Sequence, residues 1–384
     1  MNRILKLLPI IFLSLSTLLQ ANPNNIDAKT LILVDHDSNK IIFEKDPDLE
    51  IYPASMTKIM TSIIVFDLLQ QNKISMEDEV VISDTAWHMS QSGFSSMFIM
   101  PNDEVTIEDL LKGIIIVSGN DACVAIAEGV AGSEENFVEM MNEKAAEIGM
   151  LNTNFSNSSG ITDPNNYSTV RDIALMSQYL IKNYPEYYPL YAEKEFTWDR
   201  TGGDPIKQLN RNGLLYRNIG ADGIKTGYLD AEKYSLASTI KRGERRLISV
   251  GSGFKTKNFR TKESIKLLSW GFRHTETFEI SKKEETFFDI RTWLGIKDTV
   301  KGETKEDFYV TINKKDLRNF KVFLQYNGPI KAPIEKGQQI ANLKVSNKDE
   351  TIMDIPIYSA ENVKKINFFK SLFTSLNYMI WGDV

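Results

Sequence analysis

Three short motifs in this 384-residue sequence carry side chains that could perform nucleophilic chemistry. In chain order they are Ser55-Met56-Thr57-Lys58, Ser118-Gly119-Asn120 and Lys225-Thr226-Gly227. A serine hydroxyl is a weak nucleophile until a base accepts its proton. A lysine serves as that base only when burial or a neighbouring cation depresses its pKa. The three motifs together therefore indicate a serine nucleophile that a lysine base activates.

The spacing of Ser55 and Lys58 suits a helix, because residues three apart share one helical face. An apolar helical pattern begins at Thr57 and would desolvate Lys58, while Lys225 would supply a neighbouring cation if the fold brings it close. Two other Ser-x-x-Lys matches, at 238–241 and 252–255, lie in strand-like or loop sequence, where positions i and i+3 point to opposite faces. The first match is therefore the candidate nucleophile and base.

Each of the other two motifs also has a purely local interpretation. Ser118-Gly119-Asn120 follows an apolar run and precedes a helical pattern, so it could be a helix-to-helix turn with Asp121 as the next N-cap. Lys225-Thr226-Gly227 could be a solvated turn. The occurrence of all three motifs in one order favours a shared site, in which Ser118 and Asn120 present a hydroxyl and an amide to a pocket.

The elements that must position these residues form two regions. The pattern predicts a β-hairpin at 31–34 and 40–43, helices at 107–117, 121–128, 134–148 and 171–183, and strands at 236–240 and 247–250. Beyond Thr277 alternation replaces helical periodicity, with strand patterns at 308–312, 341–345 and 353–357. We expect an α+β domain followed by a small all-β domain.

Both ends of the chain carry a recognisable segment. A basic start, an uncharged apolar stretch from Leu7 to Leu19 and the small residue Ala21 predict a cleaved signal peptide over residues 1–21. An amphipathic helix is expected over 363–384, either packed on its own domain or lying on a membrane surface. The expected domains are 22–277 and 278–362.

Composition excludes several classes of protein. The formal net charge of −6 leaves no global basic field for nucleic-acid binding. A single cysteine and three scattered histidines provide neither an internal disulfide nor the ligand spacing of a zinc site. We expect no metal, no cofactor and no nucleic-acid partner.

The motifs and their surroundings resemble the low-molecular-mass penicillin-binding proteins that are D-alanyl-D-alanine carboxypeptidases. The resemblance extends over essentially the whole chain and is carried by residues 53–58 (PASMTK), 118–125 (SGNDACVA), 208–215 (QLNRNGLL), 222–227 (DGIKTG) and 267–272 (LLSWGF). It implies a β-lactamase/transpeptidase-like catalytic domain, with an antiparallel sheet flanked by helices. A small all-β domain and a C-terminal amphipathic anchor helix would follow in an exported, periplasmic protein on the outer face of the cytoplasmic membrane.

The resemblance also implies a role for each motif. Ser55 would attack the penultimate D-Ala carbonyl of a peptidoglycan stem pentapeptide ending in D-Ala-D-Ala, with Lys58 as base, and β-lactams would acylate Ser55. Ser118 and Asn120 would relay a proton and hold the peptide amide. The substrate-binding residues would be Lys225, Thr226, Gly227, Tyr228 (through its backbone N–H, in the oxyanion hole with that of Ser55) and Arg211 (for the terminal carboxylate).

Other functions remain open at this point. A class A β-lactamase has the same motif order but needs a deacylating carboxylate, and residues 152–184 contain no Glu. D,D-endopeptidase or transpeptidase action would use the same acyl-enzyme. A non-catalytic wall-binding scaffold is the alternative outside enzymology, although the intact nucleophile and base argue against it.

Overall fold

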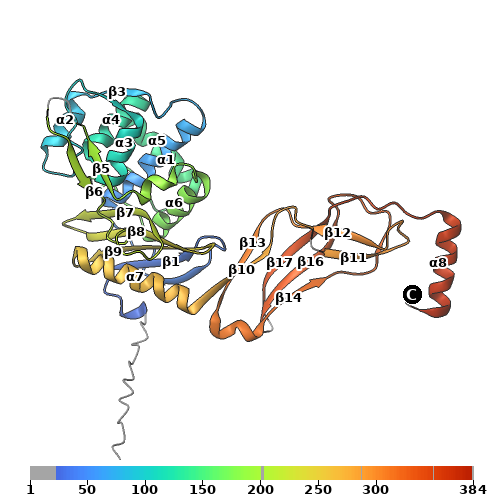
Figure 1. Ribbon diagram of the computed structural model, residues 1–384. Helices are drawn as coiled ribbons and strands as arrows, with labels where there is room; N and C mark the ends of the chain where they lie inside the picture. Colours follow the sequence, from blue (N-terminus) through green and yellow to red (C-terminus); the bar gives the residue numbers. More distant parts are fainter. Residues whose placement is uncertain (1–22, 200–202, 287, 349, 383–384) are drawn as a thin grey trace, which may run out of the picture.

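The computed structural model describes residues 23–199, 203–286, 288–348 and 350–382. They form a helix-rich domain and a narrower β-rich domain, with a terminal helix at the far end of the molecule (Figure 1). The expected signal peptide over residues 1–21 lies outside the described residues.

A five-stranded antiparallel sheet, in the order β2-β1-β9-β8-β7, forms the centre of the first domain. Its strands are β1 (Thr30–Asp35), β2 (Ile41–Lys45), β7 (Ala221–Leu229), β8 (Lys233–Arg242) and β9 (Arg245–Phe254). The predicted hairpin and the two predicted strands are confirmed as β1, β2, β8 and β9. Because β7 is an edge strand, one of its sides has no strand partner in this sheet.

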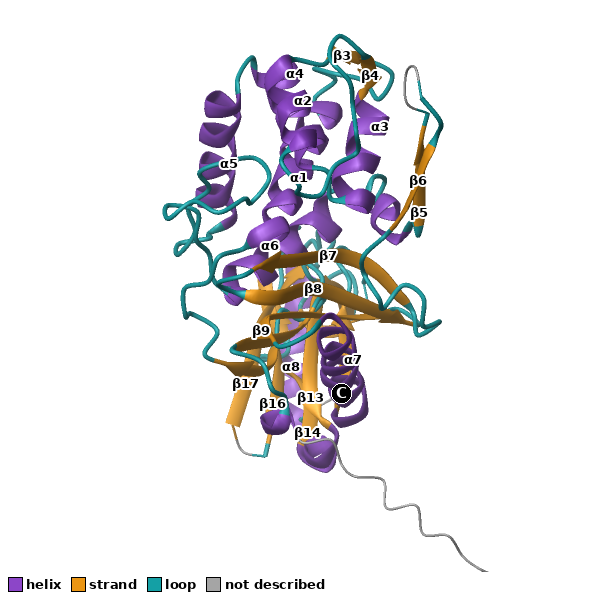
Figure 2. Cartoon of the chain, turned by 90° about the vertical axis from the view of Figure 1, so that its left-hand side faces the viewer, coloured by secondary structure: helices purple, strands orange, loops and turns teal. Residues whose placement is uncertain are grey.

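Helices cover both faces of this sheet, with a cluster on one side and α7 on the other (Figure 2). The helices of the domain are α1 (Lys58–Gln70), α2 (Asp84–Gln91), α3 (Ile107–Lys112), α4 (Asn120–Ala131), α5 (Glu134–Ile148), α6 (Val170–Asn183) and α7 (Lys257–His274). The central helix α1 is buried at every position except Asp67 and Gln70, as its apolar sequence predicts.

Short elements complete the first domain. Two small hairpins pair β3 with β4 and β5 with β6. The short elements are η1 (Pro23–Asn25), β3 (Glu79–Val81), β4 (Glu104–Thr106), the π-helical η3 (Gly113–Val117), η4 (Tyr188–Ala192), β5 (Glu195–Trp198) and β6 (Ile206–Leu209). The helix predicted over 107–117 is therefore α3 followed by one wider turn, which ends at Ser118.

The second domain is built from strands around its own apolar core. Its six-stranded sheet has the order β14-β16-β17-β12-β11-β15, and β10 pairs with β13 beside it. The elements are β10 (Thr275–Ser281), β11 (Phe288–Trp293), β12 (Thr299–Glu303), β13 (Phe308–Asn313), η5 (Lys314–Asn319), β14 (Phe320–Gln325), β15 (Ile330–Lys331), β16 (Gln339–Asn347) and β17 (Glu350–Ser359). The boundary expected after Thr277 falls inside β10.

A buried carboxylate joins the two domains. Asp35, at the end of β1, is fully buried and accepts hydrogen bonds from Arg245 Nε at 2.9 Å and from Thr277 Oγ1 at 2.5 Å. Arg245 also donates to the backbone oxygen and side chain of Thr275, and Thr277 contacts Thr311 Oγ1 at 2.9 Å. The ion pair between Asp35 and Arg245 lies within the first domain, and hydrogen bonds of its two members with Thr275 and Thr277 connect it with β10, and through Thr311 with β13, of the second.

The terminal helix α8 extends from Phe368 to Trp381, so it begins later than the predicted start at Val363. Val363 is buried in the β-domain and forms a β-bridge with Ile334, which ends the apolar stripe before the helix begins. None of the helices in the described ranges is both long enough and apolar enough to cross a bilayer.

Candidate active site

The turn that carries Ser55 lies between the sheet and the helical cluster. Residues Ala54–Thr57 form a 3-10 turn (η2), and α1 begins directly after it at Lys58. Ala54 has a φ of 50°, in the left-handed region that residues with a Cβ rarely adopt. Such backbone strain persists where the surrounding structure fixes it, and here it sets the position of the Ser55 hydroxyl.

Lys58 is fully buried, and its amine lies among three oxygen atoms. The distances from Nζ are 3.2 Å to Ser55 Oγ, 2.7 Å to Asn120 Oδ1 and 2.6 Å to the backbone oxygen of Ser159. Across residues 23–199, 203–286, 288–348 and 350–382, Lys58 has no carboxylate in ion-pair contact. The contact between Ser55 and Lys58 that their spacing predicts is therefore present in the structure.

Burial lowers the pKa of both lysines of the site. The pKa of Lys58 is lowered, first by burial and then by the positive charge of Arg211. The pKa of Lys225 is lowered well below its ordinary value by burial and by the charges of Lys58 and Arg211. Because charged lysine is costly in a dry environment, the site favours the neutral amine that a base requires.

The Ser118-Gly119-Asn120 segment brings polar groups to the same place. Ser118 ends η3 in a left-handed conformation, and Asn120 is the first residue of α4. Asp121 is not the helix cap that a purely local turn would use. It is fully buried and accepts hydrogen bonds from Ser96 Oγ and from the Met97 and Phe98 backbone N–H groups. This carboxylate thus fixes the neighbouring loop beside the site.

The Lys225-Thr226-Gly227 motif lies on edge strand β7, so it is not a solvated turn. Lys225 and Thr226 are both buried. A Cβ on Gly227 would lie 2.3 Å from Ser235 Oγ and 3.1 Å from the Pro53 backbone oxygen. Glycine is favoured here because a Cβ would clash with Ser235 of β8 and would crowd the turn that holds Ser55.

A cavity of about 740 Å³ opens over these residues. Seven of the nine predicted site residues line it, and Lys58 and Lys225 are buried side chains outside its lining. The seven are Ser55, Ser118, Asn120, Arg211, Thr226, Gly227 and Tyr228. Arg211 lies on the loop after β6, and its Nη1 donates to Ser95 Oγ at 2.6 Å. The structure thus brings all three motifs to one cavity.

Several residues of the cavity lining were missed by the sequence analysis, among them a buried arginine. Arg260 of α7 is buried, lines the cavity, and donates to the backbone oxygens of Gly227, Ser235 and Arg211. Burial lowers its pKa to about 10. Its only signal in the sequence was the residue type, because the sequence pattern did not predict the helix that carries this arginine.

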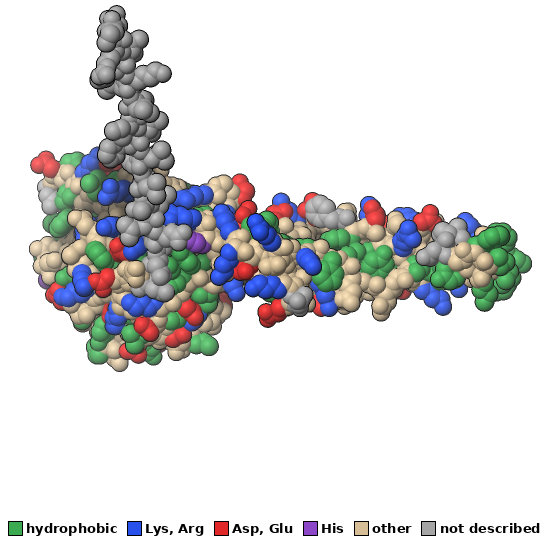
Figure 3. Space-filling view, turned by 90° about the horizontal axis from the view of Figure 1, so that it is seen from below, with side chains coloured by type: hydrophobic (Ala, Val, Ile, Leu, Met, Phe, Trp, Pro, Cys, Tyr) green, Lys and Arg blue, Asp and Glu red, His purple; other side chains and the backbone are tan. Residues whose placement is uncertain are grey.

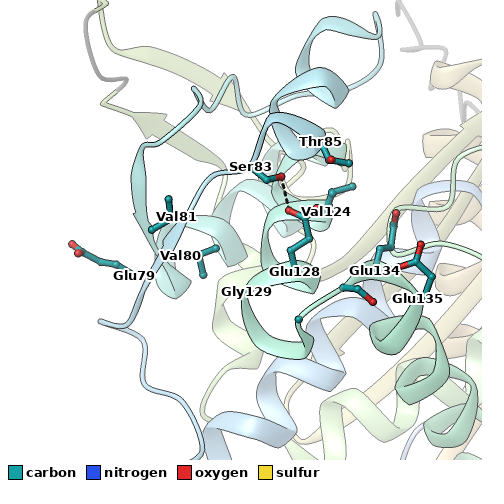
Figure 4. Close-up of a pocket in the computed structure, with 12 residues that line it drawn as sticks. Glu79, Val80, Val81, Ser83, Thr85, Val124, Glu128, Gly129, Glu134 and Glu135 are labelled. Carbon is teal, nitrogen blue, oxygen red and sulfur yellow. Dashed lines mark hydrogen bonds between the residues drawn. The ribbon is translucent and has the colours of Figure 1, made fainter.

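A second cavity, of about 610 Å³, lies beside β3 and α4 and is distinct from the catalytic one (Figure 4). Its described lining contains Glu79, Glu128, Glu134 and Glu135 and no lysine, so it lacks the serine and lysine pair of the first cavity. Glu134 connects this cavity with the loop that precedes Ser159, because its Oε1 accepts hydrogen bonds from the backbone N–H and the hydroxyl of Ser158. That contact positions the adjacent Ser159 carbonyl against Lys58. No cluster suited to a metal ion occurs in the described part of the chain.

The fold and site are those of a serine acyl-transfer enzyme of the penicillin-recognising class. The sequence matches the D-alanyl-D-alanine carboxypeptidase family, peptidase S11, over residues 17–256. It also matches the C-terminal domain of penicillin-binding protein 5 over residues 276–365. The chain therefore belongs to the S11 family of serine-type D-alanyl-D-alanine carboxypeptidases, as the sequence resemblance predicted.

Individual relatives agree along nearly the whole chain. The carboxypeptidase DacC of Escherichia coli is 41% identical over 350 residues, which cover 90% of this chain and 86% of the relative. DacA of Haemophilus influenzae is 38% identical over 94% of this chain and 91% of its own length. The crystal structure of penicillin-binding protein 5 from Haemophilus influenzae superposes with a TM-score of 0.80 at 38% identity, covering 90% of this chain and 99% of that one.

Gly160 provides a test of how closely the nucleophile turn is held. Its φ is 79°, and an added Cβ would lie 1.9 Å from the Ala54 backbone oxygen. We predict that Gly160→Ala lowers the rate of penicillin labelling on the order of a hundredfold, because the turn carrying Ser55 must move. Fluorescent-penicillin labelling measures this rate, and thermal unfolding measures the accompanying change in stability.

Gly132→Ala is the matched control for this prediction. Gly132 has a φ of 82°, but no atom lies within 4 Å of its added Cβ. This variant should lose about 1–2 kcal/mol of stability through backbone strain alone and keep its labelling rate. Equal labelling of the two variants would contradict the account.

Proposed function

We propose that Ser55 is the nucleophile of this D-alanyl-D-alanine carboxypeptidase and that Lys58 is its general base. Ser55 attacks the carbonyl of the penultimate D-Ala, the terminal D-Ala leaves, and water then hydrolyses the acyl-enzyme. The observation that carries this proposal is the 3.2 Å contact between Ser55 Oγ and the fully buried Lys58 amine.

The surroundings of Lys58 support a neutral amine with its lone pair directed at Ser55. A neutral amine has two N–H donors, and Asn120 Oδ1 and the Ser159 backbone oxygen are available to accept both. The remaining lone pair can then accept the Ser55 proton as the hydroxyl attacks. Asn120 thus orients the base in addition to holding the substrate amide.

The other cavity residues suit the charges that develop during the reaction. Ser118, in the cavity lining, would relay a proton to the leaving amine, and the backbone N–H groups of Ser55 and Tyr228 would stabilise the oxyanion. Arg211, Lys225 and the Thr226 hydroxyl would attract the terminal carboxylate. We add Arg260 to this group because it is a buried cation in the cavity lining.

We further propose that β-lactams acylate Ser55 and leave slowly. No carboxylate from residues 152–184 lines the catalytic cavity, and Asp172 is engaged by the Asn152 N–H and the Thr153 hydroxyl. A class A β-lactamase needs such a group to activate the deacylating water. Among solved relatives, penicillin-binding protein D2 of Listeria monocytogenes was crystallised in a cefotaxime-bound form, with 26% identity and a TM-score of 0.58.

We also propose that the protein is exported and lies on the outer face of the cytoplasmic membrane through α8. The helix is exposed along its length, and its apolar side chains gather at the far end of the molecule (Figure 3). Exposed members of this surface include Phe369, Phe373, Met379, Ile380 and Trp381. An amphipathic helix with nearby lysines suits an anionic lipid surface.

The first test is release of free D-alanine from diacetyl-L-Lys-D-Ala-D-Ala by mature protein that lacks residues 1–21. Wild type should release D-alanine, and Ser55→Ala should lose both this activity and penicillin labelling, because no other hydroxyl among the described residues is hydrogen-bonded to Lys58. Penicillin labelling of Ser55 without any D-alanine release would contradict the proposed substrate and leave endopeptidase action as the better assignment.

Removal of residues 368–384 tests the membrane proposal. This cut keeps Val363, which packs in the β-domain core, so folding should be preserved. The shortened protein should remain in the supernatant when sedimented with anionic vesicles, whereas the full mature chain should pellet, and both should release D-alanine equally. Pelleting of the shortened protein would show that α8 is not the anchor.

A further inference from the structure

We infer that Asp230, positioned by Tyr228, recognises a side-chain ammonium on the residue that precedes D-Ala-D-Ala in the substrate. The inference rests on the proposed function and names the substrate class of the same site. The preferred peptides carry a diamino acid with a free amine at this position. Peptides in which that amine is acylated lack the charge.

The direction of the bound peptide follows from the sheet. β7 is an edge strand that runs from Ala221 to Leu229, and its free side can accept a further strand. The terminal carboxylate would lie at the cationic end, near Lys225 and Thr226, with the scissile carbonyl at the Tyr228 N–H. The preceding residue of a peptide running antiparallel to β7 then lies beyond Tyr228.

The catalytic cavity continues in that direction. Its lining runs past Tyr228 to Leu229, Asp230 and Ala231, at the turn that follows β7. The acyl portion of the substrate therefore passes an exposed carboxylate on its way out of the cavity. A side chain on the residue before D-Ala-D-Ala would meet this carboxylate first.

Asp230 is held in place by the aromatic residue beside it. Tyr228 Oη donates to Asp230 Oδ1 at 2.6 Å, and the Tyr228 ring packs against Tyr234 with 4.6 Å between ring centroids. Arg260 in turn lies 5.7 Å from the centroid of the Tyr234 ring. This chain of contacts reduces the side-chain entropy that binding a cation would otherwise cost.

The charge on Asp230 is available for a ligand. None of the ion pairs among the described residues involves Asp230, and its Oδ2 accepts no side-chain hydrogen bond there. Lys257, the first residue of α7, lines the same cavity and opposes a cationic ligand. Asp230 therefore attracts a substrate ammonium and Lys257 repels it. Substitutions of the two residues should have opposite effects on binding.

The test compares D-alanine release from two peptides, Nα-acetyl-L-Lys-D-Ala-D-Ala and its Nα,Nε-diacetyl counterpart. At low ionic strength, wild type should show a kcat/KM about two- to fivefold higher for the free-amine peptide, the range expected for an exposed ion pair. The preference should shrink as salt is added, because solvent-exposed charges are screened.

Variants assign the preference to its residues. Asp230→Asn should bring the ratio of the two kcat/KM values to about one, Tyr228→Phe should lower it partway, and Lys257→Gln should raise it. Glu244→Gln is the control, because it removes the same charge from a fully exposed position in the β8–β9 turn and should leave the ratio unchanged.

Two outcomes would overturn the inference and leave the proposed function standing. Equal kcat/KM values for both peptides in wild type would refute recognition of the ammonium while leaving the carboxypeptidase function intact. A preference that survives Asp230→Asn would place the recognition elsewhere. Failure to release D-alanine from either peptide would instead overturn the proposed function, and the inference with it.

Discussion

The rest of the active site depends on a lysine amine that is buried without a carboxylate partner in the described structure. Burial of a lone ammonium costs several kcal/mol, so the fold must leave Lys58 largely neutral. Three neutral oxygens surround it, from Ser55 on η2, Asn120 at the start of α4 and the loop carbonyl of Ser159. Three separate parts of the chain must therefore converge within hydrogen-bond distance of one nitrogen for the chemistry to occur.

The surrounding contacts maintain this convergence. Gly160 lets its loop approach Ala54, and Glu134 fixes the neighbouring Ser158. Gly227 lets edge strand β7 pass beside the same turn, which brings a second buried lysine, Lys225, close to the first. None of the described residues of the β-domain lines the catalytic cavity. Its connection through Asp35 to β10 and β13 instead relates the catalytic domain to the exposed helix α8 at the other end of the molecule.

Local sequence patterns predicted the elements whose boundaries are set by residues close together in the sequence. The boundaries of α5 agree with the sequence prediction because Ser133 caps its first turn. Helix α7 was missed because the first half of its buried face is polar, with Arg260, Glu263 and Ser264, so apolar periodicity is weak. Ser159 contacts Lys58 through its backbone carbonyl, so the residue type at this position carries no signal. Val363 continues the apolar spacing of α8 but forms an isolated β-bridge with Ile334, in the segment between β15 and β16, which no local pattern reveals.

The most direct test is the pH dependence of Ser55 acylation by a penicillin, measured by stopped flow in wild type. Only neutral Lys58 accepts the Ser55 proton, and burial lowers its pKa. The acylation rate should therefore already be near its plateau well below the ordinary lysine pKa of about 10.4, and should fall as the pH drops through the lowered value. A rate that keeps rising about tenfold per pH unit up to pH 10 would show that Lys58 is an ordinary charged lysine, and would contradict its role as the base.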